Sequence, residues 1–282
     1  MFTTLISTAD LAARIADPAV VIVDVRHDLM QPEHWGESQY RVAHLPGAAF
    51  VHLDRDLSAP KTGRNGRHPL PPPEAASALF GRLGIGAGTQ VVPYDQHNAM
   101  FASRLWWMLR WLGHDTAAVL DGGYDKWTRE GRPTSTDVTP RPHARFAIGR
   151  VLPTAGVQDV LDSLPHKSRF VVDARAPERF RGEVEPMDPV AGHVPGAHSH
   201  PYAKNLNPDQ TFRTPAQLHA AFAEMLGPTP PDRVVHMCGS GVTSCHNILA
   251  MELAGYGLTT LYPGSWSEWC ADPARAVALG PR

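Results

Sequence analysis

This sequence of 282 residues has few cysteines, no long apolar run and almost equal numbers of positive and negative side chains. Three cysteines are too few for a disulfide framework, so free thiols and a reducing, cytoplasmic location are expected. No stretch of about 18 apolar residues occurs, which predicts that the chain has no membrane-spanning helix. Lysine and arginine number 26 against 28 aspartate and glutamate residues, which argues against a surface for nucleic acid or anionic lipid.

The most informative feature that is present is an internal repeat. The β-branched run that ends in Asp24 is echoed by the run that ends in Asp173, and the His-Leu-Pro-Gly-Ala turn at His44 is echoed by His-Val-Pro-Gly-Ala at His193. In both cases the second copy lies 149 positions after the first, so the two halves are duplicates. Runs of this kind, alternating with helical segments such as 214–226, predict parallel βαβ units.

The repeat predicts an α/β protein made of two tandem domains, each a parallel sheet flanked by helices. A Pro-rich stretch without clear periodicity separates the two copies. We therefore expect a first domain over residues 1–134, a linker over 135–152 and a second domain over 153–282.

One loop in the second half has the composition of a reactive site. It follows a β-branched run and consists of Cys238, Gly239, Ser240, Gly241, Val242 and Thr243. Two glycines let successive backbone N–H groups point inward, and such a nest at a helix start favours an anion. The same field lowers the pKa of a cysteine and favours the nucleophilic thiolate.

A simpler interpretation is that Cys238 is a small buried residue at the end of a strand. The counterpart of Cys238 in the first half is Asp95, which is followed by Gln96 and His97 and lacks the paired glycines. Because the two copies differ at this loop, we favour a single working site in the second half.

Several motifs together resemble the rhodanese superfamily, and specifically its tandem-domain sulfurtransferases. They are residues 40–50 with the turn at His44, the pairs Trp106-Trp107 and Gly113-His114, the turn at 120–123, the loop at Cys238 and residues 262–269. The resemblance implies a non-catalytic first domain, a catalytic second domain and a sulfur atom carried on Cys238 as a persulfide. No cofactor is implied, and no histidine has the spacing of a metal site.

The residues of the Cys238 loop indicate which sulfur donor the protein uses. Gly239 and Ser240 are uncharged, whereas thiosulfate enzymes usually have two basic residues there, so 3-mercaptopyruvate is favoured and thiosulfate stays the alternative. The resemblance places Ser240 in a relay with His68 and Asp54, which would manage protons as the donor's C–S bond breaks. His68 could instead be a surface histidine, Asp54 a turn or cap residue, and Ser240 a plain loop residue.

Binding of the donor carboxylate departs from the family pattern. Arg179 matches the first of two arginines that mercaptopyruvate enzymes typically carry, and it could bind a carboxylate bidentately unless it is a plain surface residue. The second position is occupied by Met187. We expect weaker binding of a keto acid unless Arg181 or Arg104 substitutes.

Two other functions compete with sulfur transfer. A phosphatase would need an arginine at the end of the loop, where Ser244 stands instead. A non-catalytic module could bind a sulfur-carrier or redox partner. For the sulfurtransferase, the expected partners are a small-molecule sulfur donor and an acceptor such as cyanide, thioredoxin or a small thiol.

Overall fold

The chain folds into two compact units in the computed structural model, which describes residues 1–281. Unit 1 comprises residues 1–59, 71–152 and 207–212, and unit 2 comprises residues 60–70, 153–206 and 213–281. Each half of the sequence therefore contributes one short segment to the unit built mainly by the other half. The domain and linker boundaries expected from the sequence stay a prediction.

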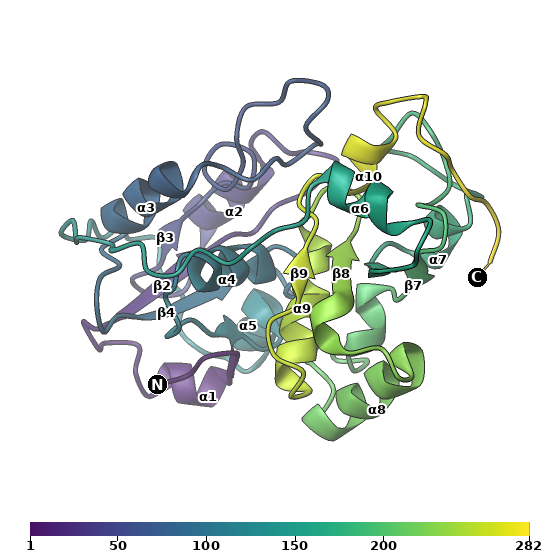
Figure 1. Ribbon diagram of the computed structural model, residues 1–282. Coiled ribbons are helices and arrows are strands. Elements are labelled where there is room, and N and C mark those ends of the chain that lie inside the picture. Colours follow the sequence, from purple (N-terminus) through teal and green to yellow (C-terminus); the bar gives the residue numbers. More distant parts are fainter. Residues whose placement is uncertain (282) are drawn as a thin grey trace. The chain divides into compact units, whose positions relative to one another are not determined.

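Unit 1 is built from short parallel strands with helices between them (Figure 1). Strands β2, β3 and β4 form one sheet in the order β3-β2-β4, and β1 pairs with β5. In chain order the elements are β1 (Leu5–Ile6), α1 (Thr8–Ala12), β2 (Val20–Asp24), α2 (Trp35–Val42), β3 (Ala49–Phe50), α3 (Pro73–Arg82), β4 (Gln90–Tyr94), α4 (Ala102–Trp111), β5 (Val119–Leu120) and α5 (Gly123–Arg129).

Unit 2 has a four-stranded parallel sheet in the order β7-β6-β8-β9. Its elements are α6 (Val157–Ser163), β6 (Phe170–Asp173), α7 (Pro177–Phe180), β7 (His198–Ser199), η1 (Tyr202–Asn205), α8 (Pro215–Leu226), η2 (Pro231–Arg233), β8 (Val234–Met237), α9 (Thr243–Leu253), β9 (Thr260–Leu261) and α10 (Ser265–Trp269). The predicted α/β class with parallel sheets in two copies is confirmed.

The central strands are buried along their whole length, which explains their composition. All five residues of β2 and all four of β8 are buried, because each strand has a partner on both sides and helices over the sheet. A strand buried on both faces needs a continuous apolar run instead of an alternating one. Helix α9 is buried over most of its length as well, so the loop between β8 and α9 is held by rigid elements at both ends.

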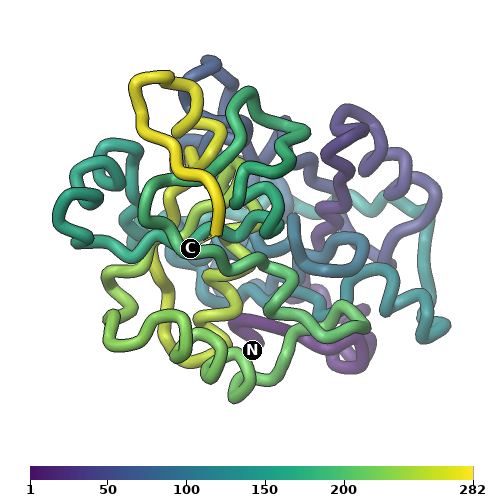
Figure 2. Tube along the Cα trace, turned by 90° about the vertical axis from the view of Figure 1, so that its right-hand side faces the viewer, coloured from purple at the N-terminus to yellow at the C-terminus, as the bar shows by residue number. Residues whose placement is uncertain are grey.

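The duplicated histidines hold equivalent turns in the two units. His44 stacks on Tyr40 with ring centroids 3.9 Å apart, and its Nδ1 lies 2.7 Å from the Tyr40 carbonyl. His193 stacks on Phe180 at 3.8 Å, and its Nδ1 lies 2.8 Å from the Phe180 carbonyl. The C-terminal segment, yellow in Figures 1 and 2, passes beside His193 and pairs with it through Ala278.

The expected linker runs along unit 1 without forming a helix or a longer strand among its described residues. The backbone N–H of Ala144 donates to the Gly81 carbonyl in the last turn of α3, and that of Leu152 donates to the Trp111 carbonyl at the end of α4. None of the helices in residues 1–281 is long and apolar enough to cross a membrane.

Candidate active site

The loop that contains Cys238 begins where β8 ends and finishes where α9 begins. This is the edge of a parallel sheet at which ligands commonly bind. Cys238 is 2% exposed, and its sulfur accepts a hydrogen bond from the backbone N–H of Ser240 at 3.4 Å. The loop continues through Gly239 and Gly241 to Val242, which immediately precedes Thr243, the first residue of α9.

The pKa of the Cys238 thiol lies below its ordinary value. Burial by itself would raise this pKa, but hydrogen bonds from the Thr243 hydroxyl, the Ser240 backbone and Ser244 outweigh the effect of burial. Hydrogen-bond donors directed at the sulfur stabilise its negative charge, so a larger fraction of this thiol is ionised at neutral pH than for an ordinary cysteine.

A neighbouring turn fixes the cysteine backbone in place. Ser265 adopts a left-handed φ of 55°, and its hydroxyl accepts the Cys238 N–H at 3.1 Å while donating to the Tyr262 carbonyl at 2.9 Å. The backbone N–H of Trp266 donates to the Cys238 carbonyl at 3.0 Å, and Ser267 does the same for Gly239 at 2.9 Å. Both polar groups of the Cys238 backbone are therefore satisfied inside the fold.

Ser240 and His68 lie together, as the sequence predicts. The Ser240 hydroxyl is 2.7 Å from His68 Nδ1, and the two residues are 6% and 2% exposed. Although 172 positions separate them in the sequence, both belong to unit 2, because the segment 60–70 packs there. A serine hydroxyl bonded to an imidazole can give up or take back a proton.

Asp54 belongs to unit 1, where it lies beside two buried histidines. Its Oδ2 lies 3.7 Å from His27 Nε2, and its backbone N–H donates to His52 Nδ1 at 3.1 Å. One ligand atom each from Asp54, His27 and His52 lie within 4.8 Å of one another. However, His52 Nδ1 already accepts backbone N–H groups, and its Nε2 lies 2.8 Å from the Pro32 carbonyl, so His52 has no spare nitrogen for a metal ion.

Two guanidinium groups lie beside the loop, one of them foreseen from the sequence. Arg179, the predicted residue, binds Glu185 at 2.6 Å. The second is Arg67, which sequence analysis missed: a β-carbon at position 239 would lie only 2.9 Å from its Nη2. Arg181 instead pairs with Glu183 at 2.7 Å. The available signal was that Arg67 directly precedes His68.

A model of the rhodanese-like domain matches residues 7–130 and 157–272. The chain belongs to the rhodanese family. Its two matched segments correspond to the two copies of the internal repeat, and the resemblance noted from the motifs is confirmed.

Several relatives of the chain are named sulfurtransferases. It is 43% identical over 286 residues to a Pseudomonas aeruginosa protein named probable 3-mercaptopyruvate sulfurtransferase, with 98% of each chain covered. It is 35% identical over 255 residues to the thiosulfate sulfurtransferase of Cricetulus griseus, covering 86% of this chain and 83% of the relative. The structure of a 3-mercaptopyruvate sulfotransferase from Escherichia coli aligns with a TM-score of 0.80 at 29% identity, covering 94% and 99% of the two chains. The protein is thus a sulfurtransferase enzyme.

The first rhodanese-like domain has a carboxylate where the second has the thiol. At the end of β4, Asp95 Oδ2 accepts the N–H groups of Phe101 at 2.8 Å and Ala102 at 3.1 Å, and Oδ1 accepts that of Ala99 at 3.0 Å. The N–H of Tyr124 donates to the Asp95 carbonyl at 2.9 Å, as Trp266 does to Cys238. The cradle of N–H groups in this rhodanese-like domain is therefore occupied by its own side chain.

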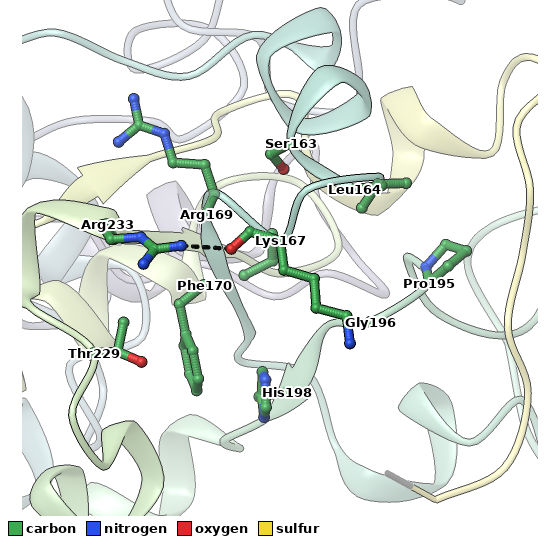
Figure 3. Close-up of a pocket in the computed structure, with 11 residues that line it drawn as sticks. Ser163, Leu164, Lys167, Arg169, Phe170, Pro195, Gly196, His198, Thr229 and Arg233 are labelled. Atoms are coloured by element: carbon green, nitrogen blue, oxygen red, sulfur yellow. Dashed lines mark hydrogen bonds between the residues drawn. The ribbon is translucent and has the colours of Figure 1, made fainter.

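A separate cavity of about 430 Å³ lies in the second rhodanese-like domain, at the edge where β6 and β7 begin (Figure 3). Phe170 and His198 stack there with ring centroids 3.9 Å apart, and Arg233 donates to the Lys167 carbonyl at 2.5 Å. Cys238 follows the C-terminal end of β8, so the Cys238 loop and this cavity lie at opposite edges of the parallel sheet.

Proposed function

We propose that the enzyme moves sulfur from 3-mercaptopyruvate to a thiol or cyanide acceptor through a persulfide on Cys238. The observation that carries the proposal is a buried thiol of lowered pKa in a loop with no charged residue of its own, next to a serine hydroxyl 2.7 Å from His68. The similarity to proteins named 3-mercaptopyruvate sulfurtransferase supports the same donor.

In the proposed reaction the Cys238 thiolate attacks the sulfur of mercaptopyruvate. An S–S bond forms, the C–S bond breaks, and its electron pair goes to the methylene carbon as the enolate of pyruvate. The proton on the donor's sulfur ends on that carbon, with the Ser240 hydroxyl and His68 passing it. The family resemblance assigns Asp54 to the same relay. The backbone N–H groups of Gly239, Gly241, Val242 and Thr243 hold the persulfide anion until an acceptor attacks its outer sulfur.

Thiosulfate is the second candidate donor. The thiosulfate sulfurtransferase among the relatives supports it, and Arg67 and Arg179 are two cations that would also attract a dianion. The acceptor, whether thioredoxin, a small thiol or cyanide, and a cytoplasmic location stay part of the proposal.

Intact-mass measurement after incubation with each donor tests the proposal. We expect a gain of about 32 Da, one sulfur atom, that is absent from Cys238→Ser. The donor that gives the faster gain is the preferred one. Ser240→Ala should slow persulfide formation from mercaptopyruvate in single-turnover experiments, and an unchanged rate would remove the relay. If neither donor adds mass, the proposed reaction is wrong.

A further inference from the structure

The cavity of about 430 Å³ in unit 2 is lined by three positive side chains (Figure 3). Lys167 and Arg169 come shortly before β6, and Arg233 is the last residue of η2, directly before β8. Among the described residues that line the cavity there is no aspartate or glutamate. A concave surface with fixed charges of one sign concentrates counter-ions, so this cavity attracts anions. Its volume lies in the range of small-molecule sites, on the order of 300–1,000 Å³.

Backbone carbonyls, and no carboxylates, hold the two guanidinium groups. Arg233 donates through Nε to the Ser168 carbonyl at 2.9 Å and through Nη2 to the Lys167 carbonyl at 2.5 Å. Arg169 Nη1 donates to the Asp232 carbonyl at 3.0 Å. Lys167 has a left-handed φ of 48°, a conformation that a residue with a side chain keeps only where its surroundings hold it. The cations are therefore positioned by the fold and keep their full charge.

The hydrogen-bond donors that stay available lie on two sides of the cavity. Within residues 1–281, no hydrogen bond uses Arg233 Nη1, the Lys167 ammonium, or Nε and Nη2 of Arg169. In Figure 3 both guanidinium groups lie on one side, and the Lys167 side chain extends toward Gly196 on the other. A guanidinium fork suits the oxygens of a phosphate, whereas an ammonium is a point charge that suits a single acidic group. The donors therefore suit a ligand with acidic groups at both ends.

The cavity also has an aromatic and apolar lining. Phe170 and His198 stack with ring centroids 3.9 Å apart and an interplanar angle of 11°, and both rings are partly exposed. Leu164 and Pro195 line the same cavity and are partly exposed too. An inorganic anion would leave this surface in contact with water, whereas an organic group would cover it.

We propose that this cavity binds a small organic anion that carries a phosphate ester at one end and a carboxylate at the other. Arg169 and Arg233 bind the phosphate, Lys167 binds the carboxylate, and the organic part covers the Phe170–His198 ring pair. The inference goes beyond the proposed function and does not depend on it, because the cavity and the Cys238 loop lie at opposite edges of the sheet.

The test is calorimetric binding of two probes that differ by one carboxylate, 4-carboxyphenyl phosphate and phenyl phosphate. Lys167→Gln should weaken binding of 4-carboxyphenyl phosphate by about tenfold, the loss of one contact to a charged group, and leave phenyl phosphate within about twofold. Arg233→Gln should weaken binding of both probes by about tenfold or more, because both carry the phosphate. Lys167→Gln keeps the proposal testable if Arg233→Gln does not fold, since the Lys167 ammonium makes no hydrogen bond within residues 1–281.

Arg213→Gln is the matched control. Arg213 also belongs to unit 2, and its Nη1 donates to the Lys204 carbonyl at 3.4 Å, but it does not line the cavity. Binding of both probes should stay within about twofold of the parent value in this variant. Losses as large as those of Arg233→Gln would show that the probes respond to overall charge, which would overturn the site.

A second control separates the cavity from the reactive loop. Arg179→Gln removes a cation beside Cys238 and should leave binding of both probes unchanged. Binding that is lost in Arg179→Gln and kept in Lys167→Gln and Arg233→Gln would place the anion at the Cys238 loop and contradict the proposal. No sulfur transfer is needed for these measurements, so failure of the proposed reaction and failure of the anion site are distinguishable.

Discussion

At the residue scale, Gly241 shows how closely the reactive loop is fitted to its surroundings. Its φ is 76°, in the left-handed region, and a β-carbon at this position would overlap the Pro263 carbonyl oxygen. Pro263 precedes the turn whose Ser265 hydroxyl accepts the Cys238 N–H. A side chain at position 241 must therefore push apart the two segments that position the thiol.

Gly241→Ala should accordingly destabilise the protein and abolish most persulfide formation. Gly257→Ala is the control, because Gly257 has the same φ of 76° but a β-carbon there would meet no atom within 4 Å. The control should lose only the left-handed backbone preference, about 1 kcal/mol, with activity retained. Thermal unfolding and single-turnover persulfide formation would measure both variants. Equal behaviour of the two would mean that the approach of Pro263 is unimportant.

At the element scale, each of two parallel strands ends in a buried ion pair that the duplication has preserved. Arg26 binds Asp24 after β2, and Arg175 binds Asp173 after β6, both at 2.7 Å. All four residues are at most 3% exposed, so each pair is fully surrounded by protein. A buried carboxylate that loses its partner is left without compensation.

Arg26→Met should destabilise the protein by about 3–5 kcal/mol, because it leaves the Asp24 carboxylate unpaired in the core. The double variant Asp24→Asn with Arg26→Met should regain much of this loss, since no buried charge then remains. Urea unfolding curves would give the free energies of unfolding. A single variant within about 1 kcal/mol of the parent would show that Tyr94, which donates to Asp24 at 2.6 Å, suffices to hold the carboxylate.

Elements of this kind could be predicted because their signals are local. The β-branched runs predicted the central strands of the two larger sheets, and the predicted helical segment 214–226 matches α8 (Pro215–Leu226). Composition and resemblance predicted Cys238, Ser240 and His68 as site residues, and the Ser240 hydroxyl does lie 2.7 Å from His68 Nδ1. Arg67 was not predicted, because its place depends on contacts such as its backbone N–H to the Ser267 hydroxyl, 200 positions away. The loop that carries Arg67 is rich in Gly and Pro and has no periodic pattern, so the sequence does not indicate that it packs against Ser267.

At the scale of the whole molecule, the segment 207–212 ties the second half of the sequence into unit 1. Its last residue, Phe212, donates its backbone N–H to Asp121 Oδ1 at 2.9 Å. Burial raises the pKa of Asp121 to about 6, although the hydrogen bond from Phe212 and the charge of Lys126 act in the opposite direction. The ionised form of Asp121 is thus disfavoured at the point where the segment 207–212 attaches to unit 1.

This arrangement predicts a pH-dependent stability with a definite sign. Because the pKa of Asp121 is higher in the folded state than its ordinary value of 3.8, its contribution is fully present below about pH 4 and is lost as the pH rises through 6. Asp121→Asn keeps the carbonyl acceptor for Phe212 without the charge. It should match the parent near pH 4 and be more stable at pH 7, by less than about 3 kcal/mol because Asp121 is partly solvated.

Urea unfolding of both proteins at pH 4 and pH 7 would measure the effect. Asp209→Asn provides a control of opposite sign in the same segment, because hydrogen bonds from Thr211 lower the pKa of the Asp209 carboxyl. Removing that charge should not stabilise the protein at pH 7. If Asp121→Asn gives the same difference at both pH values, the Asp121 carboxylate does not titrate as its burial implies, and the attachment of 207–212 depends on the hydrogen bond alone.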